Sequence, residues 1–260
     1  MGKEKLSIVK IGGHIIENSF ALTEFLKLFS NLEGKKILVH GGGKRATNMA
    51  SKLGIESKMV HGRRITDSQT LEVITMVYAG LVNKNMVAQL QGLGLNAMGL
   101  TGADGNTIYS EKRPVQEIDY GFVGDVKRVN FNAINKLIEA NFTPVFCAIT
   151  HDGYGQLLNT NADKISSQVA IGMSQLYETT LYYCFELNGV LKDIKDENSV
   201  LKPIDTSIYK ELLNEGVIID GMIPKLENCF EALKGGVKTI NMGNIAMLTK
   251  ENDNFTRITI

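Results

Sequence analysis

The chain has 260 residues, of which 43% are hydrophobic and 22% are charged, an ordinary composition for a globular protein with a sizeable core. Its 28 basic and 28 acidic side chains cancel, so no overall field draws the protein to nucleic acid or to an anionic membrane. No apolar run approaches the ~20 residues that span a bilayer, and no signal-peptide pattern precedes the first predicted strand. We therefore expect a cytoplasmic protein that binds neither nucleic acid nor a membrane, and any anion site must be local.

The cysteines and histidines do not form a ligand pattern. The cysteines stand far apart, each in an apolar stretch, which predicts buried thiols in a reducing compartment rather than disulfides: they are Cys147, Cys184 and Cys229. The histidines lack the spacing of metal ligands: they are His14, His40, His61 and His151. We expect no metal site built from protein side chains.

Strands and helices alternate over the first hundred residues. The apolar patterns predict strands at 6–11, 36–39 and 97–100, helices at 17–32, 44–53 and 67–91, and an exposed hairpin at 57–66. Gly54 ends the second helix and Asp67 caps the third. The apolar stripe of this third helix is predicted to be Val73, Ile74, Val77, Leu81, Val87 and Leu90.

The alternation continues to the end of the chain. We predict hairpins over the sheet edge at 101–129, helices at 131–140, 161–173, 204–215 and 223–233, and strands at 143–149, 179–185 and 237–242. A glycine-containing loop occupies 151–160, and an edge strand is predicted at 256–260. Buried strands that alternate with helices favour an α/β fold, in which helices cover both faces of a mostly parallel sheet.

Two glycine turns each follow a predicted strand. Lys10-Ile-Gly-Gly13 ends the first strand, and His40-Gly-Gly-Gly43 ends the second. A strand that ends in glycines and opens into a helix exposes backbone N–H groups to an anion. Two such turns at the carboxyl ends of parallel strands indicate a phosphoryl group held from both sides. Neither turn completes a P-loop or a dinucleotide fingerprint, so the phosphate cradle is of another kind.

Two lysines stand where an anion would stabilise them. Lys10 lies within an apolar strand, where a lysine needs an anion or a carboxylate unless its ammonium group reaches water. Lys225 follows Pro224 in the first turn of a helix, where the dipole disfavours a cation unless an anion is bound.

Further polar side chains surround the same strand ends. Asn159, Asn161 and Asp163 precede or open a helix, and capping alone would explain Asn161. Arg63 and Arg64 follow a glycine, and a guanidinium group suits a carboxylate, although a solvated hairpin tip would also carry arginines.

Taken together, these segments resemble the amino acid kinase family, and most closely its N-acetylglutamate kinase branch, over roughly residues 5–242. Six segments match the motifs of the family in order: Lys10–Gly13, His40–Gly43, Gly62–Thr66, the hairpin stretch 99–126, Asn159–Asp163 and Gly221–Lys225. The resemblance implies a single domain over 1–260 with the three-layer αβα sandwich of carbamate kinase-like proteins. It also implies an N-terminal lobe, about 1–176, for acyl-amino-acid binding and dimerisation, and a C-terminal lobe, about 177–260, for the nucleotide.

The resemblance also implies an activity, the second step of arginine biosynthesis. ATP with Mg²⁺ would donate its γ-phosphoryl group to the γ-carboxylate of an N-acyl-L-glutamate. The resemblance assigns Lys10, Lys225 and Asp163 to catalysis, and Lys10, Gly12, Gly13 and Lys225 to the ATP phosphates. It assigns Gly42, Gly43, Arg64 and Asn159 to the acyl-glutamate, and no residue to a metal.

Departures from the family pattern leave alternatives open. Lys44 and Arg63 add positive charge near the expected glutamate site, which would favour a succinyl over an acetyl group. The segments at 184–193, near the expected adenine, at 240–244 and at 254–260 also differ from the family pattern. The alternatives are an N-succinylglutamate kinase, a kinase for another acceptor such as carbamate, aspartate or UMP, and a non-catalytic effector-binding homologue.

The start of the chain bears on assembly. Arginine-inhibited members of the family carry an additional N-terminal helix that links dimers into a hexamer. The first predicted strand begins about five residues into this sequence, so we expect a homodimer without that arginine switch. The helix 67–91 is a plausible dimer surface.

Overall fold

The computed structural model describes residues 2–60, 62–218, 221–249 and 251–260, and His61 lies outside the described residues. The chain forms two compact units, Met1–Ile37 with Ser166–Ile260, and Leu38–Ile165. The expected lobes, about 1–176 and 177–260, are defined by the ligand that each would bind rather than by packing. Their assignment to ligands stays a prediction.

The first unit is built on a sheet in the order β12-β14-β13-β11-β1. The strands are β1 (Lys5–Ile11), β11 (Glu178–Cys184), β12 (Pro203–Ile204), β13 (Thr239–Gly243) and β14 (Thr256–Ile258). β1, β11 and β13 are parallel neighbours, whereas β14 runs antiparallel to β13. Ile8 and Val9 of β1 point to opposite faces of the sheet and both are 0% exposed, so helices must cover both faces.

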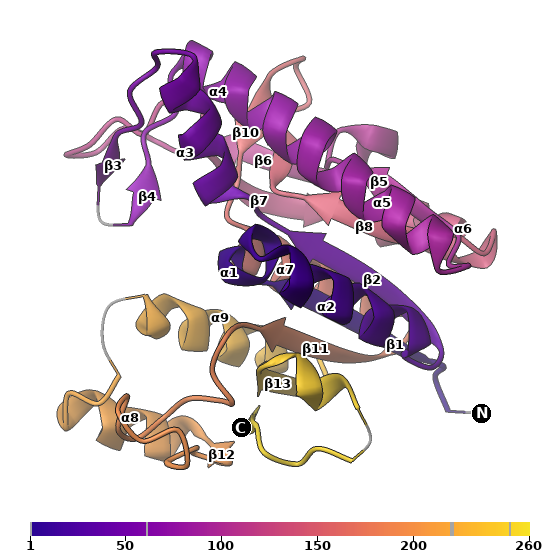
Figure 1. Cartoon of the computed structure of the whole chain (residues 1–260), viewed down its shortest axis with the longest axis vertical. Coiled ribbons are helices and arrows are strands. Elements are labelled where there is room, and N and C mark those ends of the chain that lie inside the picture. The colour runs from indigo at the N-terminus through magenta and orange to yellow at the C-terminus, as the bar shows by residue number, and fades with distance from the viewer. Residues whose placement is uncertain (1, 61, 219–220, 250) are drawn as a thin grey trace. The chain divides into compact units, whose positions relative to one another are not determined.

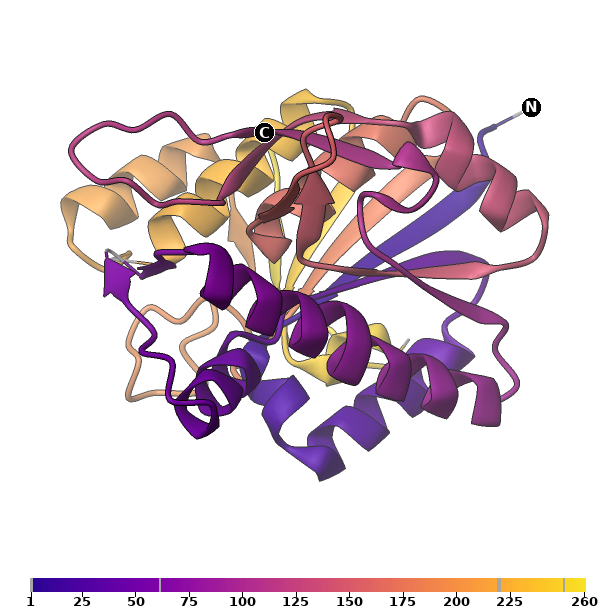
Figure 2. The same ribbon diagram turned by 90° about the horizontal axis from the view of Figure 1, so that it is seen from above.

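Helices lie on both sides of this sheet (Figure 2). Those of the first unit are α1 (Gly13–Glu17), α2 (Ser19–Asn31), α8 (Thr206–Asn214), α9 (Met222–Lys234) and the 3-10 helix η3 (Ile245–Leu248). α1 and α2, in indigo, lie on one side of the strands, and α9, in orange, lies on the other. Asn18 caps α2 by accepting a hydrogen bond from the backbone N–H of Ala21 at 3.0 Å.

The second unit contains three parallel strands of the eight-stranded sheet. Its strands are β2 (Lys35–His40, which begins in the first unit), β5 (Ala97–Leu100) and β8 (Thr143–Cys147), in the order β2-β8-β5. Both neighbouring pairs are parallel. Val145 and Phe146 of β8 are 0% exposed on opposite faces, between α5 (Asn83–Gly92) on one side and α6 (Phe131–Glu139) on the other.

A smaller sheet and a hairpin complete this unit. The small sheet has the order β10-β9-β6-β7, with β6 (Ile108–Lys112), β7 (Gly124–Val129), β9 (Ile149–His151) and β10 (Leu157–Asn159). The hairpin joins β3 (Met59–Val60) to β4 (Arg63–Arg64). The remaining elements are α3 (Gly43–Lys52), the 3-10 helix η2 (Asp104–Asn106) and α7 (Ala162–Met173), which continues into the first unit.

One long helical rod runs along the second unit (Figure 1). It consists of α4 (Ser68–Thr75), the π-helix η1 (Met76–Val82) and α5. Asp67 caps it, as predicted, by accepting a hydrogen bond from the backbone N–H of Thr70 at 2.8 Å. The predicted apolar stripe is wrong at Leu81, which is 44% exposed. The stripe moves by one residue at η1 and continues at Val82 and Met86, which are 3% and 0% exposed.

The structure confirms the predicted α/β fold with a mostly parallel sheet and corrects three local predictions. β14 is an internal strand between β12 and β13, not the predicted edge strand, because Pro203–Ile204 adds one further strand. The predicted loop at 151–160 includes the turn and second strand of a hairpin, β9 and β10. The hairpin at 57–66 is not exposed throughout, since Arg64 is 8% exposed. No helix of the described chain has the length and hydropathy of a membrane span.

Candidate active site

The second glycine turn needs glycine for two reasons. Gly42 is the N-cap residue of α3 and has φ of 151°, a conformation that side chains disfavour. A Cβ at Gly42 would also lie 3.1 Å from the ring of Tyr78. The turn therefore lies directly against an aromatic ring of the π-helix. The backbone N–H groups at the start of α3 are donors for an anion.

His40, the first residue of this turn, holds the turn in place through hydrogen bonds of its buried ring. It is fully buried, its Nδ1 lies 2.8 Å from the carbonyl oxygen of Gly41, and its Nε2 lies 3.0 Å from Nδ2 of Asn83. An amide nitrogen only donates, so Nε2 accepts and Nδ1–H donates to the carbonyl group. Burial lowers the pKa of His40 to about 4, with a further lowering by the charge of Lys84. The imidazole is therefore neutral and fixed in one tautomer.

Arg64 enters the same region from β4. It is 8% exposed, and its Nη2 donates to the carbonyl oxygen of Gly43 at 3.0 Å and to Oγ1 of Thr47 at 2.7 Å. Arg63, the adjacent residue, is exposed. Of the two arginines, Arg64 is the one with a defined orientation.

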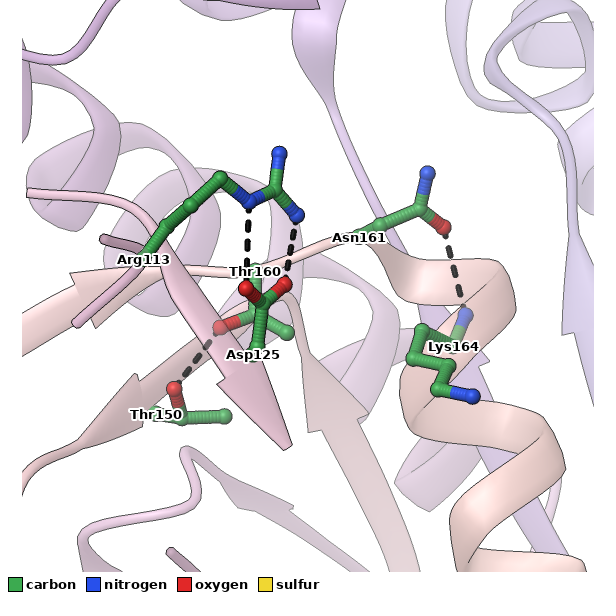
Figure 3. A network of polar contacts seen from close by, with 6 residues as sticks. All are labelled: Arg113, Asp125, Thr150, Thr160, Asn161 and Lys164. Carbon is green, nitrogen blue, oxygen red and sulfur yellow. Dashed lines mark hydrogen bonds and ion pairs between the residues drawn. The ribbon is translucent and has the colours of Figure 1, made fainter. Parts of the chain in front are cut away.

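Asn159 approaches from the end of β10. Its Nδ2 donates to Oγ1 of Thr66 at 3.0 Å, and its strand pairs with Val123 through an isolated bridge. The next residue, Thr160, is joined to Thr150 by a hydroxyl–hydroxyl hydrogen bond of 2.7 Å (Figure 3). Asn161 then caps α7, because its Oδ1 accepts from the backbone N–H groups of Asp163 and Lys164 at 2.7 and 3.2 Å. The capping interpretation of Asn161 is confirmed.

These side chains line one cavity of about 210 Å³ within the second unit. The lining residues are Gly43, Met59, Gly62, Arg63, Arg64, Tyr78, Arg113, Val123, Asn159, Thr160 and Asn161. Three of these described residues are arginines and none is acidic. The cavity is suited to a small anionic ligand.

Arg113 is the third arginine of the cavity. Its Nε and Nη2 donate to the two carboxylate oxygens of Asp125, at 3.1 and 2.5 Å, in a bidentate pair (Figure 3). The guanidinium group also lies 5.5 Å from the centre of the Tyr120 ring. Its Nη1 is buried and has no hydrogen-bond partner among the described residues. That nitrogen is a donor available to a ligand oxygen.

The first unit carries the other glycine turn. Gly12 donates its N–H to the carbonyl oxygen of Cys184 at 2.9 Å, which fixes the end of β1 beside the end of β11. Lys10 is half-buried two residues earlier, and Lys225 is half-buried in the first turns of α9. The ammonium group of Lys225 lies 5.6 Å from the centre of the Phe185 ring, in the segment that departs from the family pattern.

Comparison with known proteins decides the family. A model of the amino acid kinase family matches residues 5–244. The chain belongs to the amino acid kinase family. The acetylglutamate kinase of Bacteroides fragilis is 55% identical over 238 residues, which cover 92% of this chain and 91% of that protein. The acetylglutamate kinase of Bacteroides thetaiotaomicron is 52% identical over 256 residues, with 98% and 99% covered. The crystal structure of smu.665 from Streptococcus mutans has a TM-score of 0.79 at 25% identity and covers 98% of both chains.

The predicted site residues of this amino acid kinase fall into two groups. The second unit brings Gly42, Gly43, Arg64 and Asn159 together around the cavity or the turn beneath it. The first unit holds Lys10, Gly12, Gly13 and Lys225, and Asp163 lies in the second unit at the start of α7. The roles of these residues in binding and catalysis stay predictions.

Sequence reasoning missed four residues of these regions. They are Thr47, Tyr78, Arg113 and Phe185. Tyr78 had a signal, because the apolar pattern of the rod resumes one residue late at Val82 and Met86. Thr47 and Phe185 stand in the predicted helix 44–53 and the predicted strand 179–185, where the pattern predicts an element but no role for the side chain. Arg113 stands in the predicted hairpins at 101–129 and belongs to no motif.

Proposed function

We propose that this amino acid kinase is an N-acetylglutamate kinase, which transfers the γ-phosphoryl group of ATP to the γ-carboxylate of N-acetyl-L-glutamate. The observation that carries the proposal is the cavity of the second unit, lined by arginines and without an acidic side chain among its described residues. Relatives that share more than half of their residues with the chain over nine-tenths of its length are named acetylglutamate kinase.

The chemistry requires positioning and charge stabilisation rather than a base. A carboxylate is already a competent nucleophile, so the enzyme must align it with the phosphorus atom and stabilise the charge that develops. Lys10 and Lys225 would neutralise the transferring phosphoryl group. Asp163 would orient the two ammonium groups.

The substrates would be held by backbone and side-chain donors. The N–H groups of Gly12 and Gly13 would bind the ATP phosphates, and those of Gly42 and Gly43 would bind the reacting end of the acyl-glutamate. Arg64 and Asn159 would hold its α-carboxylate. Since Arg64 is oriented by Gly43 and Thr47, little side-chain entropy remains to be lost on binding.

Mg²⁺ would accompany ATP. The described residues contain no group of three or more histidine, cysteine, aspartate or glutamate side chains that could hold a metal ion. Mg²⁺ keeps several waters and is bound in many kinases through substrate phosphates. We infer that phosphate oxygens and water would supply most of its ligands here.

An acyl-phosphate assay tests the proposal. Hydroxylamine converts an acyl phosphate into a hydroxamate, so product is counted after incubation with ATP, Mg²⁺ and N-acetyl-L-glutamate. Parallel reactions with carbamate, aspartate and UMP, followed by ADP release, test the other acceptors. Turnover of N-acetyl-L-glutamate alone is the expected result. Turnover of another acceptor alone, or nucleotide binding without any transfer, would replace the proposal by one of its alternatives.

A second candidate substrate, N-succinyl-L-glutamate, is favoured by Arg113. A succinyl group adds a carboxylate, and the buried Nη1 of Arg113 is a donor with no partner among the described residues. Arg113→Gln would then raise KM for the succinyl substrate about tenfold and leave that for the acetyl substrate unchanged. The matched control is Arg128→Gln, because Arg128 is exposed on β7 and outside the cavity. Equal effects of Arg113→Gln on both substrates would exclude this role.

We also propose a homodimer assembled through the rod, in a reducing, cytoplasmic location. Met76 and Leu81, which are 56% and 44% exposed, lie five residues apart on the outer face of η1. All three cysteines are free and buried, as a reducing compartment favours. Sedimentation velocity should give a dimer for the wild type and a monomer for a Met76→Lys/Leu81→Lys variant. A wild-type protein that is monomeric at the concentration used in the activity assay would contradict the proposed dimer.

A further inference from the structure

The helical rod changes its hydrogen-bond pattern beside the cavity. Over Met76–Val82 it is a π-helix, and the backbone N–H of Asn83 donates to the carbonyl oxygen of Tyr78, five residues earlier. A turn closed over five residues is wider than an α-helical turn, so residues five apart lie closer together around the axis than in an α-helix, where 3.6 residues per turn separate them by about 140°. The π-helix thus brings Tyr78 and Asn83, the first residue of α5, nearer to one side of the rod.

Both side chains meet the second glycine turn. The Tyr78 ring would lie 3.1 Å from a Cβ at Gly42, and its hydroxyl 3.8 Å from a Cβ at Gly43. Asn83, which is 1% exposed, donates to Nε2 of His40 at 3.0 Å and to the carbonyl oxygen of Val145 at 2.9 Å. The π-helix therefore fixes the position of the turn relative to β8 through two contacts, one aromatic and one polar.

Tyr78 also contacts Arg64, the arginine inside the cavity. A Cβ at Gly43 would lie 3.8 Å from the Tyr78 hydroxyl oxygen and 4.0 Å from Nη2 of Arg64, so the phenol and the guanidinium group meet at the same glycine. Arginine has donors only, so toward Arg64 the phenolic oxygen can only accept, and its own O–H remains for an acceptor such as a ligand oxygen. Burial raises the pKa of Tyr78, and the neighbouring charge of Arg64 offsets this only in part, so the phenol is protonated at neutral pH.

We propose that Tyr78, placed by the π-helix, is a further substrate-binding residue that orients Arg64 and donates its O–H to the same α-carboxylate. The inference rests on the proposed function, because it takes an acyl-glutamate as the ligand of the cavity. Tyr78 lines that cavity although it is only 6% exposed, so its hydroxyl is held in place before a ligand binds. A carboxylate between the two groups would accept from a guanidinium N–H on one oxygen and from a phenol O–H on the other.

The test combines a protein change with a ligand change. Tyr78→Phe removes only the hydroxyl. N-Acetyl-4-aminobutyrate lacks the α-carboxylate of the ligand and has no acceptor in its place. Equilibrium dissociation constants are measured by calorimetry for both ligands with the wild type and the variant. We expect Tyr78→Phe to weaken the binding of N-acetyl-L-glutamate about tenfold and to leave the binding of N-acetyl-4-aminobutyrate within about twofold.

Tyr177→Phe is the matched control. Tyr177 is as buried, at 6% exposure, and its hydroxyl lies in the other unit, 3.5 Å from Nζ of Lys35. It should change neither dissociation constant. If Tyr78→Phe weakens the binding of both ligands equally, the role of the tyrosine is only structural. If it weakens the binding of neither, the hydroxyl does not contact the ligand. Either result overturns the proposal, as does a wild type that binds no acyl-glutamate.

Turnover, measured separately, distinguishes this inference from the proposed function. A wild type that binds N-acetyl-L-glutamate without ATP-dependent transfer would refute the kinase activity, while the role of Tyr78 would still be decided by the binding constants. A wild type with full turnover and an unchanged Tyr78→Phe dissociation constant would retain the activity and refute the inference. With both correct, Tyr78→Phe raises KM for the acyl-glutamate about tenfold and leaves kcat within about twofold.

Discussion

The buried His40 makes the stability of the protein depend on pH between neutrality and pH 5. Its pKa falls from the model-compound 6.5 to about 4 in the folded protein, because burial removes water from the charged form. The unfolded chain therefore binds the proton first as the pH falls. The contribution of neutral His40 to the unfolding free energy is therefore fully present above about pH 6.5. It is lost as the pH falls toward about 4.

The magnitude follows from the two pKa values. Between about pH 8 and about pH 5, a group that titrates at 6.5 unfolded and at about 4 folded removes about 2 kcal/mol of unfolding free energy. His40→Gln keeps an amide near the position of Nε2 but cannot titrate. We expect this variant to be less stable than the wild type at neutral pH, and to lose about 2 kcal/mol less between the two pH values.

Urea unfolding followed by far-ultraviolet circular dichroism measures the difference, and is suitable because the chain contains no tryptophan. The exposed His14 supplies the matched control, since His14→Gln should show the wild-type dependence on pH. The reasoning would be refuted if the wild type and His40→Gln lost the same free energy over this range. It would also be refuted if His14→Gln abolished the pH dependence.

Two further sets of substitutions test the role of the lysines in phosphoryl transfer and the packing of the second glycine turn. Lys10→Ala or Lys225→Ala should lower kcat by roughly 10²-fold or more in the acyl-phosphate assay, because one charge-stabilising donor is lost. A near-normal kcat in both variants would contradict the role of these lysines. Gly42→Ala should lower the unfolding free energy by about 1–3 kcal/mol, because a methyl group there meets the Tyr78 ring at a strained φ. Gly80→Ala, whose Cβ meets open space in the same π-helix, should not destabilise in urea titrations; equal losses in the two variants would contradict the explanation.

Local signals account for most of the fold. A cap, a helix end and an apolar strand each depend on residues only a few positions apart in the sequence. The structure confirms these local predictions for the cap Asp67, the helix end at Gly54 and the strands at 6–11 and 97–100. The prediction of an edge strand at the C-terminus was wrong for a long-range reason. The neighbour that makes β14 internal is the two-residue strand Pro203–Ile204, which is too short to leave a periodic pattern.

The site divides in the same way. Arg64, Asn159 and the glycine turns belong to short motifs, so their sequence neighbours were enough to single them out. Tyr78 and Arg113 contribute through contacts between distant segments, namely the π-helix with β4 and the residue after β6 with β7. The one-residue shift of the apolar stripe was visible at Val82 and Met86, but periodicity at 3.6 residues assigned Leu81 to the core instead.

The groups around the cavity differ in whether they add positive charge or only a hydrogen-bond donor. A chain without net charge has to create its anion site locally, and this cavity does so with arginines from β4 and the hairpin between β6 and β7. A charged His40 would add a further cation beneath the turn, yet burial keeps it neutral, so the turn contributes N–H donors and no additional charge. Tyr78 likewise adds a donor without a charge. Tyr78 in the π-helix and Asn83 at the start of α5 contact these neutral groups and the turn, and we expect carboxylate binding in the cavity to depend on how Arg64 is oriented as well as on the positive charge around it.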